Sequence, residues 1–443
     1  MLLGRPPLSS GTPRRKLTAE ELRELLRSLW ILAAVVLLLA GLAFQQAAAA
    51  AVGTLVLLAG AGALLWSRLS LERVYYERSW LERRATVGDE IEVRFSVRNR
   101  KALPVPWLNV RDIVPEALQA LTTRVLPGPW ENTCVYTHTT SLGPYERVRW
   151  RERFRCAARG YFQVGQTRLR AGDLLGLFPR EHELPTTDTI IVLPRRIDLA
   201  ETPLPHARPF GAARGENRLF EDPSRIAGIR DYRPGDPLKR IDWKATARRG
   251  ALQARLYDPS ATTLLLIALN ADTLAHSWEG YDPLLLERVV TVAASLAALA
   301  DDSAFSFGLL VNCTYPGANR PLIVPAGRNP EQLARVLEAL ATVGPFTVSS
   351  LEELLERQAR KLPLGASIAV VTGYLGAGLA RRIERLRSEG FAVAVYWAAD
   401  TPPQHYPQAI PVHDVSPRLR AFERSDPLAY GGTTPELVRL WTR

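Results

Sequence analysis

Between residues 28 and 67 the chain contains no charged side chain, and few polar residues interrupt the apolar run. A single membrane-spanning helix needs about 20 apolar residues, so this run is too long for one span. It predicts two transmembrane helices, residues 29–44 and residues 47–66, which turn at Gln45 and Gln46. A buried helical hairpin in a soluble core is the alternative. It is less favoured because core helices rarely exceed about 18 residues without a charge.

The flanks of the apolar run predict its orientation. Basic residues precede and follow the run, whereas the connecting turn has none. Because Lys and Arg near span ends are retained on the cytoplasmic side, both ends of the hairpin are expected in the cytoplasm. Residues 1–28 form a basic cytoplasmic segment suited to anionic lipid headgroups, and residues 29–66 form the hairpin in the lipid bilayer. The chain is therefore expected to be a multi-pass protein of the inner or plasma membrane, with its bulk in the cytoplasm.

After Glu77 the apolar positions alternate with a period of two, which is typical of half-buried strands. The alternation is clearest in residues 148–156, where apolar side chains share one face and four arginines share the other. A solvated outer face, with glutamates on adjacent strands, is favoured for these arginines over a phosphate or headgroup site, because antiparallel sheets are commonly wet on one side. Residues 78–200 are therefore predicted to form an all-β, sandwich-like domain. Its strand candidates are residues 91–97, 107–110, 134–140, 148–156, 161–169 and 189–193.

From residue 259 on, short apolar runs alternate with amphipathic helical patterns. This alternation predicts an α/β domain at residues 259–400, with a doubly wound, mostly parallel sheet. Ligands of such sheets bind beyond the carboxyl ends of the strands. Residues 401–443 are interpreted as a C-terminal extension that begins with a surface loop.

A charged block, residues 205–258, joins the two predicted domains. Residues 205–256 hold 12 Lys or Arg and 6 Asp or Glu, so they carry +6 of the chain's net charge of +11. An excess of this sign favours an anionic partner. Within the stretch DYRPGDPLKRIDWKATARRG, the pattern predicts a helix over residues 237–249, with Asp236 as its N-cap and Gly250 after its last turn.

Each carboxylate in that stretch has a cationic neighbour within four residues, a setting that keeps Asp ionised and its pKa low. Proton transfer normally needs a His or an isolated carboxylate, so a brace between the two soluble domains or a docking surface is favoured over catalysis. A hydrolase or transferase that uses these carboxylates is the first alternative. Binding of anionic lipid or nucleic acid is the second, and nucleic acid is not expected because aromatic residues are not interleaved with the basic ones. The residues of the predicted interaction or structural motif are Arg230, Asp231, Tyr232, Arg233, Pro234, Gly235, Asp236, Arg240, Asp242, Trp243, Lys244, Arg248, Arg249 and Gly250.

Three stretches, PVPWLNVRD, RGYFQVGQTRLRAGDLLGLF and GIRDYRPGDPLKRIDWKATARRG, resemble the bacterial family known as domain of unknown function 58. The resemblance covers nearly the whole chain after Ala19. It implies a C-terminal domain similar to von Willebrand factor A domains and an association with MoxR-type AAA+ ATPases, and it implies no reaction. The chain is therefore expected to be a non-enzymatic, membrane-anchored adaptor that helps to assemble or remodel a client complex whose identity stays open.

The resemblance also directs attention to a metal site. Metal-binding von Willebrand A domains carry Asp-x-Ser-x-Ser after their first strand, and a second Asp after a later strand, whose oxygens complete a Mg²⁺ shell. Here the first motif aligns with Asn270, Asp272 and Leu274, and the later strand ends at Thr372 and Gly373. Both sets lack required oxygens, so the site is expected to be degenerate. The 3 cysteines and 6 histidines show no metal-ligand spacing either, and neither metal nor cofactor is expected.

Overall fold

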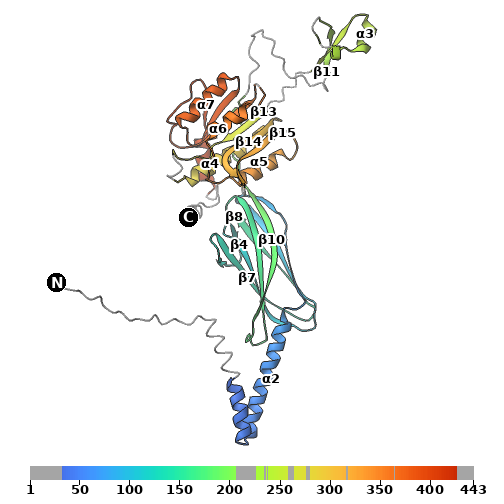
Figure 1. Cartoon of the computed structure of the whole chain (residues 1–443), viewed down its shortest axis with the longest axis vertical. Helices are drawn as coiled ribbons and strands as arrows, with labels where there is room; N and C mark the ends of the chain where they lie inside the picture. The colour runs from blue at the N-terminus through green and yellow to red at the C-terminus, as the bar shows by residue number, and fades with distance from the viewer. Residues whose placement is uncertain are drawn as a thin grey trace, which may run out of the picture.

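The computed structural model describes residues 32–205, 226–233, 236, 238–257, 264–275, 280–315, 318–363 and 365–426. Figure 1 shows a helical hairpin, a β-rich domain and an α/β domain arranged along the longest axis, with a small module that contains β11 and α3 to one side. The predicted basic segment at residues 1–28, together with Pro234 and Gly235, lies outside the described residues.

The apolar run forms two helices, Leu32–Ala43 and α2 (Ala47–Ser70), and the predicted turn at the glutamine pair is confirmed. Gln45 takes the left-handed conformation with φ of 53°, and the Gln46 N–H donates to the carbonyl of Gly41 at 2.8 Å. Glycines let the helices approach closely, because a Cβ on Gly53 would lie 2.7 Å from the backbone nitrogen of Leu38. Small residues at the contact are typical of helix pairs in membranes.

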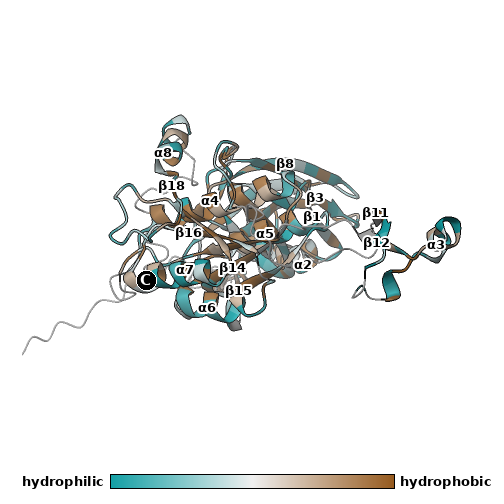
Figure 2. Cartoon of the chain, turned by 90° about the horizontal axis from the view of Figure 1, so that it is seen from above, coloured by the Kyte–Doolittle hydropathy of each residue, from teal (hydrophilic) through white to brown (hydrophobic). Residues whose placement is uncertain are grey.

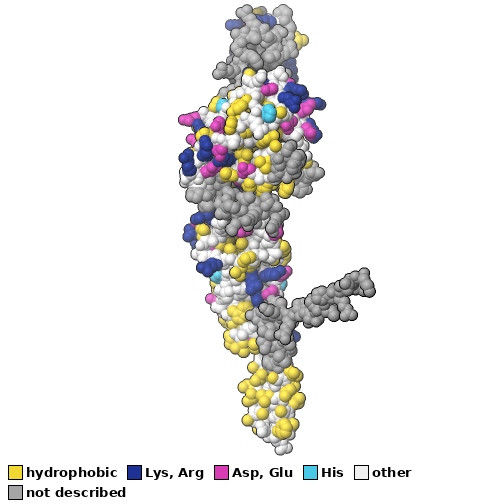
Figure 3. All heavy atoms as spheres, turned by 90° about the vertical axis from the view of Figure 1, so that its left-hand side faces the viewer, with side chains coloured by type: hydrophobic (Ala, Val, Ile, Leu, Met, Phe, Trp, Pro, Cys, Tyr) yellow, Lys and Arg dark blue, Asp and Glu magenta, His cyan; other side chains and the backbone are white. Residues whose placement is uncertain are grey.

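The outer surface of the hairpin is apolar. Leucines of α2 such as Leu55 and Leu58 are about two-thirds exposed, and Figure 3 shows the hairpin as a column of hydrophobic side chains. At 1.5 Å per residue the 24 residues of α2 extend about 36 Å, enough to cross a bilayer. Helix α4 (Pro283–Asp302) is also long and apolar, but it is mostly buried inside the α/β domain. The hairpin is therefore the part suited to a membrane.

Two sheets form the middle domain, with strand orders β1-β3-β8-β5 and β2-β10-β9-β4-β7-β6. Phe95 of one sheet stacks on Tyr136 of the other at a centroid distance of 5.3 Å, and both belong to a core that the sheets share. The sheets therefore pack face to face, and all six predicted strands are present. The strands are β1 (Val74–Trp80), β2 (Arg84–Thr86), β3 (Glu90–Asn99), β4 (Val105–Pro115), β5 (Leu118–Ala120), β6 (Leu126–Pro127), β7 (Thr133–Leu142), β8 (Arg147–Cys156), β9 (Gly160–Ala171) and β10 (Arg180–Leu193).

The arginine face of β8 is a solvated outer face, as predicted. Arg155 and Arg153 lie opposite Glu90 and Glu92 on β3, and Glu90 pairs with Arg155 at 3.1 Å and with Arg153 at 3.5 Å. Such exposed pairs contribute about 0–1 kcal/mol each. Glu152, on the inner face of the same strand, is instead buried and accepts hydrogen bonds from Thr122 and Thr123.

Inside the sandwich lies an ionic cluster that the alternating pattern did not reveal. The Arg78 guanidinium contacts Asp112 at 3.2 Å and Asp188 at 2.8 Å, and it donates to the Val164 carbonyl. The Tyr76 hydroxyl donates to Asp112 at 2.5 Å, and Thr167 donates to the same carboxylate. Burial, with the nearby Asp112 charge, raises the pKa of Tyr76 well above its ordinary value. The sandwich therefore contains a paired and hydrogen-bonded charge cluster.

The C-terminal domain has a six-stranded mixed sheet in the order β15-β14-β13-β16-β17-β18. Among the described strands, the β14–β15 pairing alone is antiparallel, so the predicted alternation of strands and helices and the mostly parallel sheet are present. The elements are β13 (Leu264–Leu269), α4, β14 (Ser306–Tyr315), β15 (Ala318–Gly327), α5 (Gln332–Ala341), α6 (Leu351–Ala359), β16 (Ser367–Thr372), α7 (Ala377–Ser388), β17 (Ala392–Trp397), β18 (Val412–Asp414) and α8 (Ser416–Ser425).

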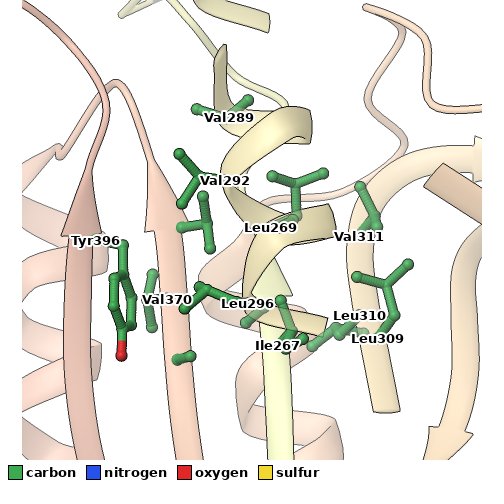
Figure 4. Packing of buried hydrophobic residues seen from close by; sticks show 14 of the residues in the cluster. Ile267, Leu269, Val289, Val292, Leu296, Leu309, Leu310, Val311, Val370 and Tyr396 are labelled. Atoms are coloured by element: carbon green, nitrogen blue, oxygen red, sulfur yellow. The ribbon is translucent and has the colours of Figure 1, made fainter. Parts of the chain in front are cut away.

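Helix α4 supplies much of the core of this domain. Asp282 caps it by accepting the Leu285 N–H at 3.1 Å. Figure 4 shows Val289, Val292 and Leu296 of α4 beside strand residues such as Ile267. In Figure 2 the strands and α4 are largely hydrophobic in colour, whereas α6 and α7 carry hydrophilic residues. The apolar strands are thus enclosed by helices, as the alternating sequence pattern predicts.

Of the predicted C-terminal extension, residues 401–443, the structure describes residues 401–426, and these belong to the α/β domain. Strand β18 adds to the sheet beside β17, and Leu419 of α8 is fully buried in the core. The buried Arg288 of α4 also donates to both carboxylate oxygens of Glu423, at 2.6 and 2.9 Å. The domain therefore continues to α8. The turn-rich residues between β17 and β18 hid this continuation in the sequence.

Candidate functional site

The charged block folds as a small module around a two-stranded hairpin. Strand β11 (Ile226–Asp231) pairs with β12 (Gln253–Tyr257), and between them lie η1 (Leu238–Arg240) and α3 (Trp243–Arg249). The predicted helix over residues 237–249 is therefore wrong in its first half. Ile241 is buried and forms a bridge with Ala254, and this contact interrupts the helix before Asp242.

Asp242, not Asp236, caps the helix. Its Oδ1 accepts the N–H groups of Lys244 and Ala245, both at 3.0 Å, and its Oδ2 accepts the Arg255 Nε–H at 3.0 Å. The Ala245 amide and the Arg255 guanidinium together lower the pKa of Asp242. Gly250 follows the last turn with φ of 69° and donates to Thr246, as predicted.

Asp236 makes a two-pronged ion pair. Arg230 donates to both of its carboxylate oxygens at 2.8 Å, and the backbone N–H of Arg233 adds a bond at 3.0 Å. The hydrogen bonds from Arg230 and then from Arg233 lower the pKa of Asp236 to about 2. A carboxylate held in this way stays ionised at neutral pH and accepts hydrogen bonds, which does not suit it to proton transfer.

Gln253 is a member of the network that sequence reasoning missed. It is fully buried, and its Nε2 donates to Asp231 at 2.7 Å while its backbone N–H donates to Thr246 at 3.0 Å. The Tyr232 hydroxyl donates to the Asp236 carbonyl at 3.2 Å. The ALQARLY stretch gave no sequence signal for this role, because the partners of Gln253 lie on other elements.

The module also presents side chains to solvent. Leu238 is 73% exposed and Trp243 is 68% exposed, and Lys244 and Arg248 are exposed on the same short helix as Trp243. We call these four residues the module surface. Exposed large apolar side chains and arginines are common in protein-binding surfaces.

The structure assigns the contact between the sandwich and the α/β domain to residues outside the charged block. Arg159, from the β8–β9 connection, donates to the carbonyl of Leu340 in the last turn of α5 and to that of Val343 just after it, and it pairs with Glu287. Arg84 pairs with Glu338 of α5 at 2.7 Å. The bonds of the block described above join its own residues, and Figure 1 draws it apart from both domains. Arg159 and Arg84 thus join the two domains, and the role of the charged block as a brace or a docking surface stays a prediction.

The ion pairs of the module predict its response to acid. The folded pKa of Asp236 is depressed to about 2 from an ordinary value of 3.8, so pairing stabilises the module above pH about 3.8. That stabilisation is lost as the pH falls from about 3.8 to about 2. Hydrogen exchange of peptides covering residues 226–257 is expected to accelerate in this window beyond the intrinsic pH effect. Asp236→Asn should weaken the transition and leave the part that the lowered pKa of Asp242 contributes. An unchanged acid response in that variant would contradict the assignment.

At the carboxyl end of the sheet, polar side chains form a second cluster. Asn270 follows β13, and its Nδ2 donates to Thr372 Oγ1 and to the Tyr374 carbonyl, both at 3.2 Å. Asn312 of β14, also missed in the sequence, donates to Asn270 Oδ1 at 3.1 Å and to Asp272 Oδ2 at 2.8 Å. The side chains of this cluster therefore satisfy one another.

These residues do not fit a magnesium site of the von Willebrand A type. The Asn270 amide is fully engaged, and Leu274 supplies no oxygen. At Thr372, where those domains carry an Asp, the side chain is a hydroxyl, which accepts from the Asn270 amide and donates to the Tyr374 carbonyl. The Asp272 carboxyl stands among amides, and burial raises its pKa. One carboxylate in such a setting cannot complete a six-oxygen shell.

We therefore expect millimolar Mg²⁺ to leave the melting temperature of the α/β domain unchanged. Asp272→Asn is expected to give the same melting temperature with and without Mg²⁺, because Asn keeps an oxygen to accept the Asn312 N–H. The measurement is scanning calorimetry in matched ionic strength. A magnesium-dependent rise that Asp272→Ala abolishes would show a working site.

Residues 228–408 match the model of the family described as Protein of unknown function DUF58. Over 215 residues the chain is 25% identical to the uncharacterized protein YeaD of Bacillus subtilis (strain 168), which covers 47% of this chain. The chain spans about half of that relative, 48% of its length.

Likenesses to solved structures are partial. The CARDB domain of the PF1109 protein from Pyrococcus furiosus, described in complex with di-metal ions, is 16% identical over 27% of this chain and 91% of its own, with a TM-score of 0.19. A cohesin module from a Clostridium perfringens family 33 glycoside hydrolase is 12% identical over 26% of this chain and 96% of its own, with a TM-score of 0.20.

Proposed function

We propose, from the premise that the C-terminal region of this chain is a DUF58 domain, that the protein is a membrane-anchored adaptor without an enzymatic activity of its own. The hairpin anchors the chain, with the two soluble domains in the cytoplasm. The module surface binds a partner protein, and the partner that the family resemblance implies is a MoxR-type AAA+ ATPase. Together they assemble or remodel a client complex.

The proposal depends on one observation. The outer surface of the helical hairpin is apolar and suited to lipid, whereas the module surface, on a separate part of the chain, has the residue types of a protein-binding surface. The leucines of α2 face outward, and Trp243 is 68% exposed on a module whose carboxylates are occupied by its own arginines. An exposed indole beside cations is a common binding hot spot. The lowered pKa values of Asp236 and Asp242 argue against the rival carboxylate enzyme.

We further propose that the α/β domain is von Willebrand A-like with a degenerate metal site. The central position of β13 and the antiparallel edge strand β15 support this. In such a domain the partner would be bound without a bridging metal, through side chains alone.

The test is capture of a purified MoxR-type ATPase by the full-length chain in detergent. Trp243→Ala is expected to weaken binding by about tenfold or more, as for a hot-spot aromatic residue. Tyr406→Ala is the matched control, because Tyr406 is 62% exposed on the α/β domain. Equal binding by the wild type and Trp243→Ala would count against the module surface. If the purified chain converts a substrate, and replacing Asp231 or Asp242 abolishes this activity without lowering stability, the result would favour the rival hydrolase or transferase.

A further inference from the structure

The connection between β9 and β10 exposes an unusual amount of apolar surface. Leu174 is 75% exposed, Leu175 is 73% exposed and Leu177 is 36% exposed, and the three lie within the segment 173–178. We call this segment the leucine loop. Single exposed leucines are ordinary on soluble proteins, whereas a contiguous group indicates a surface that another apolar phase covers.

The loop is held in one conformation by Asp173. The buried Asp173 carboxylate accepts the N–H groups of Leu175 at 3.0 Å, Leu177 at 3.2 Å and Phe178 at 2.7 Å. The Trp107 Nε1–H donates to the Asp173 carbonyl at 2.9 Å. These hydrogen bonds order the backbone with the leucine side chains facing outward. Covering the leucines therefore costs little additional conformational entropy.

A hydrogen bond to α2 fixes the position of the leucine loop along the axis of this membrane helix. The Ser67 hydroxyl of α2 donates to the Phe178 carbonyl, and both Ser67 and Ser70 are buried at this junction. The Lys101 Nζ donates to the Ser70 carbonyl at 2.7 Å and so joins the end of α2 to the sandwich. Residues 47–66 of α2 extend about 30 Å, the thickness of the hydrocarbon core. The leucine loop therefore lies where the hydrocarbon ends.

The residues beside the loop suit a lipid headgroup region. Tyr145, on the neighbouring β7–β8 turn, is 68% exposed, and its backbone N–H donates to the Lys101 carbonyl at 3.2 Å. Arg68, Arg73 and Arg100 are exposed around the same junction. Figure 3 shows hydrophobic side chains at the base of the sandwich, directly above the hairpin. Aromatic and basic side chains are the usual residues of a membrane interface.

From this geometry we infer that the leucine loop is a second membrane contact, which inserts Leu174 and Leu175 into the interfacial layer of the leaflet that α2 enters. The inference rests on the membrane anchorage in the proposed function. If the transmembrane hairpin were the one contact, the sandwich could tilt about the end of α2. A second contact at the leucine loop fixes the angle between the sandwich and the bilayer. The occupant of this surface is lipid, because continuity with α2 places the loop at the bilayer.

The experiment uses the full-length chain in nanodiscs of phosphatidylcholine and phosphatidylglycerol. A Cys134→Ser background leaves Cys156 and Cys313, which are buried, and the fluorophore NBD is attached at Leu175→Cys. The matched control carries the label at Leu126→Cys, because Leu126 is 61% exposed on β6, at the opposite end of the sandwich. The label at 175 is expected to emit at shorter wavelength and to be quenched by interfacial spin-labelled lipid severalfold more strongly than the label at 126.

Two outcomes separate this inference from the anchorage on which it depends. A chain that resists alkaline extraction but whose two labels are quenched equally overturns the leucine loop alone. A chain that alkaline treatment releases overturns the anchorage and the loop together. In a second variant, Leu174→Ser with Leu175→Ser, a label at Tyr145→Cys is expected to lose most of its quenching, because the leucines no longer hold the turn at the interface. Retained quenching there would also count against the inference.

Discussion

Replacement of Arg159 by alanine is expected to lower the free energy of unfolding of the joined soluble domains by about 3–5 kcal/mol, the usual effect of breaking a buried ion pair. The Arg159 side chain is only 5% exposed. It donates to two carbonyls at the end of α5 and pairs with Glu287, so its loss leaves all three groups without this cation. The carbonyl end of a helix particularly favours a positive charge.

Scanning calorimetry of the detergent-solubilised chain measures this effect. In the wild type the sandwich and the α/β domain are expected to unfold together, and in Arg159→Ala their transitions are expected to separate. Arg147→Ala is the control, because Arg147 pairs with the exposed Glu77 at 3.1 Å on the sandwich surface and should cost at most about 1 kcal/mol. Equal effects of the two variants would contradict the role of Arg159.

Replacement of Asp112 by alanine is expected to be comparably severe, again about 3–5 kcal/mol, because Asp112 is one of the two carboxylates paired with the buried Arg78. Its side chain is 1% exposed, and it also accepts hydrogen bonds from Tyr76 and Thr167. Without it, Arg78 keeps only Asp188 and the Val164 carbonyl. Small domains are stable by about 5–15 kcal/mol, so the loss is a large part of the total.

Urea denaturation followed by tryptophan fluorescence tests this prediction, since Trp80 and Trp150 contact the sandwich core. Glu90→Ala is the matched control on the outer face of the sandwich, where it pairs with two half-exposed arginines and should change stability by about 0–1 kcal/mol. A midpoint for Asp112→Ala close to that of the control would show that the cluster is not needed for folding.

In the charged block, the sequence predicted the right kinds of interaction but placed the start of the helix wrongly. Its composition predicted an arginine–carboxylate network and a glycine after the helix, and both are present at Asp236 and Gly250. The helix was predicted from Pro237 because Asp236 is also a good cap. In the structure Ile241 instead forms a bridge with Ala254 of β12. Burial of Ile241 against this strand is more favourable than a helix that continues through it.

The sequence by itself determined the elements whose signal is local. The turn at Gln45 and Gln46, the alternating strands of the sandwich and the order of elements in the α/β domain follow from periods and charges over a few residues. Only the tertiary structure decided which distant residues meet. Arg159 contacts carbonyls more than 180 positions away, and Ser67 contacts the leucine loop 111 positions away. Such contacts depend on how the domains pack against each other, and no periodic pattern in the sequence predicts them.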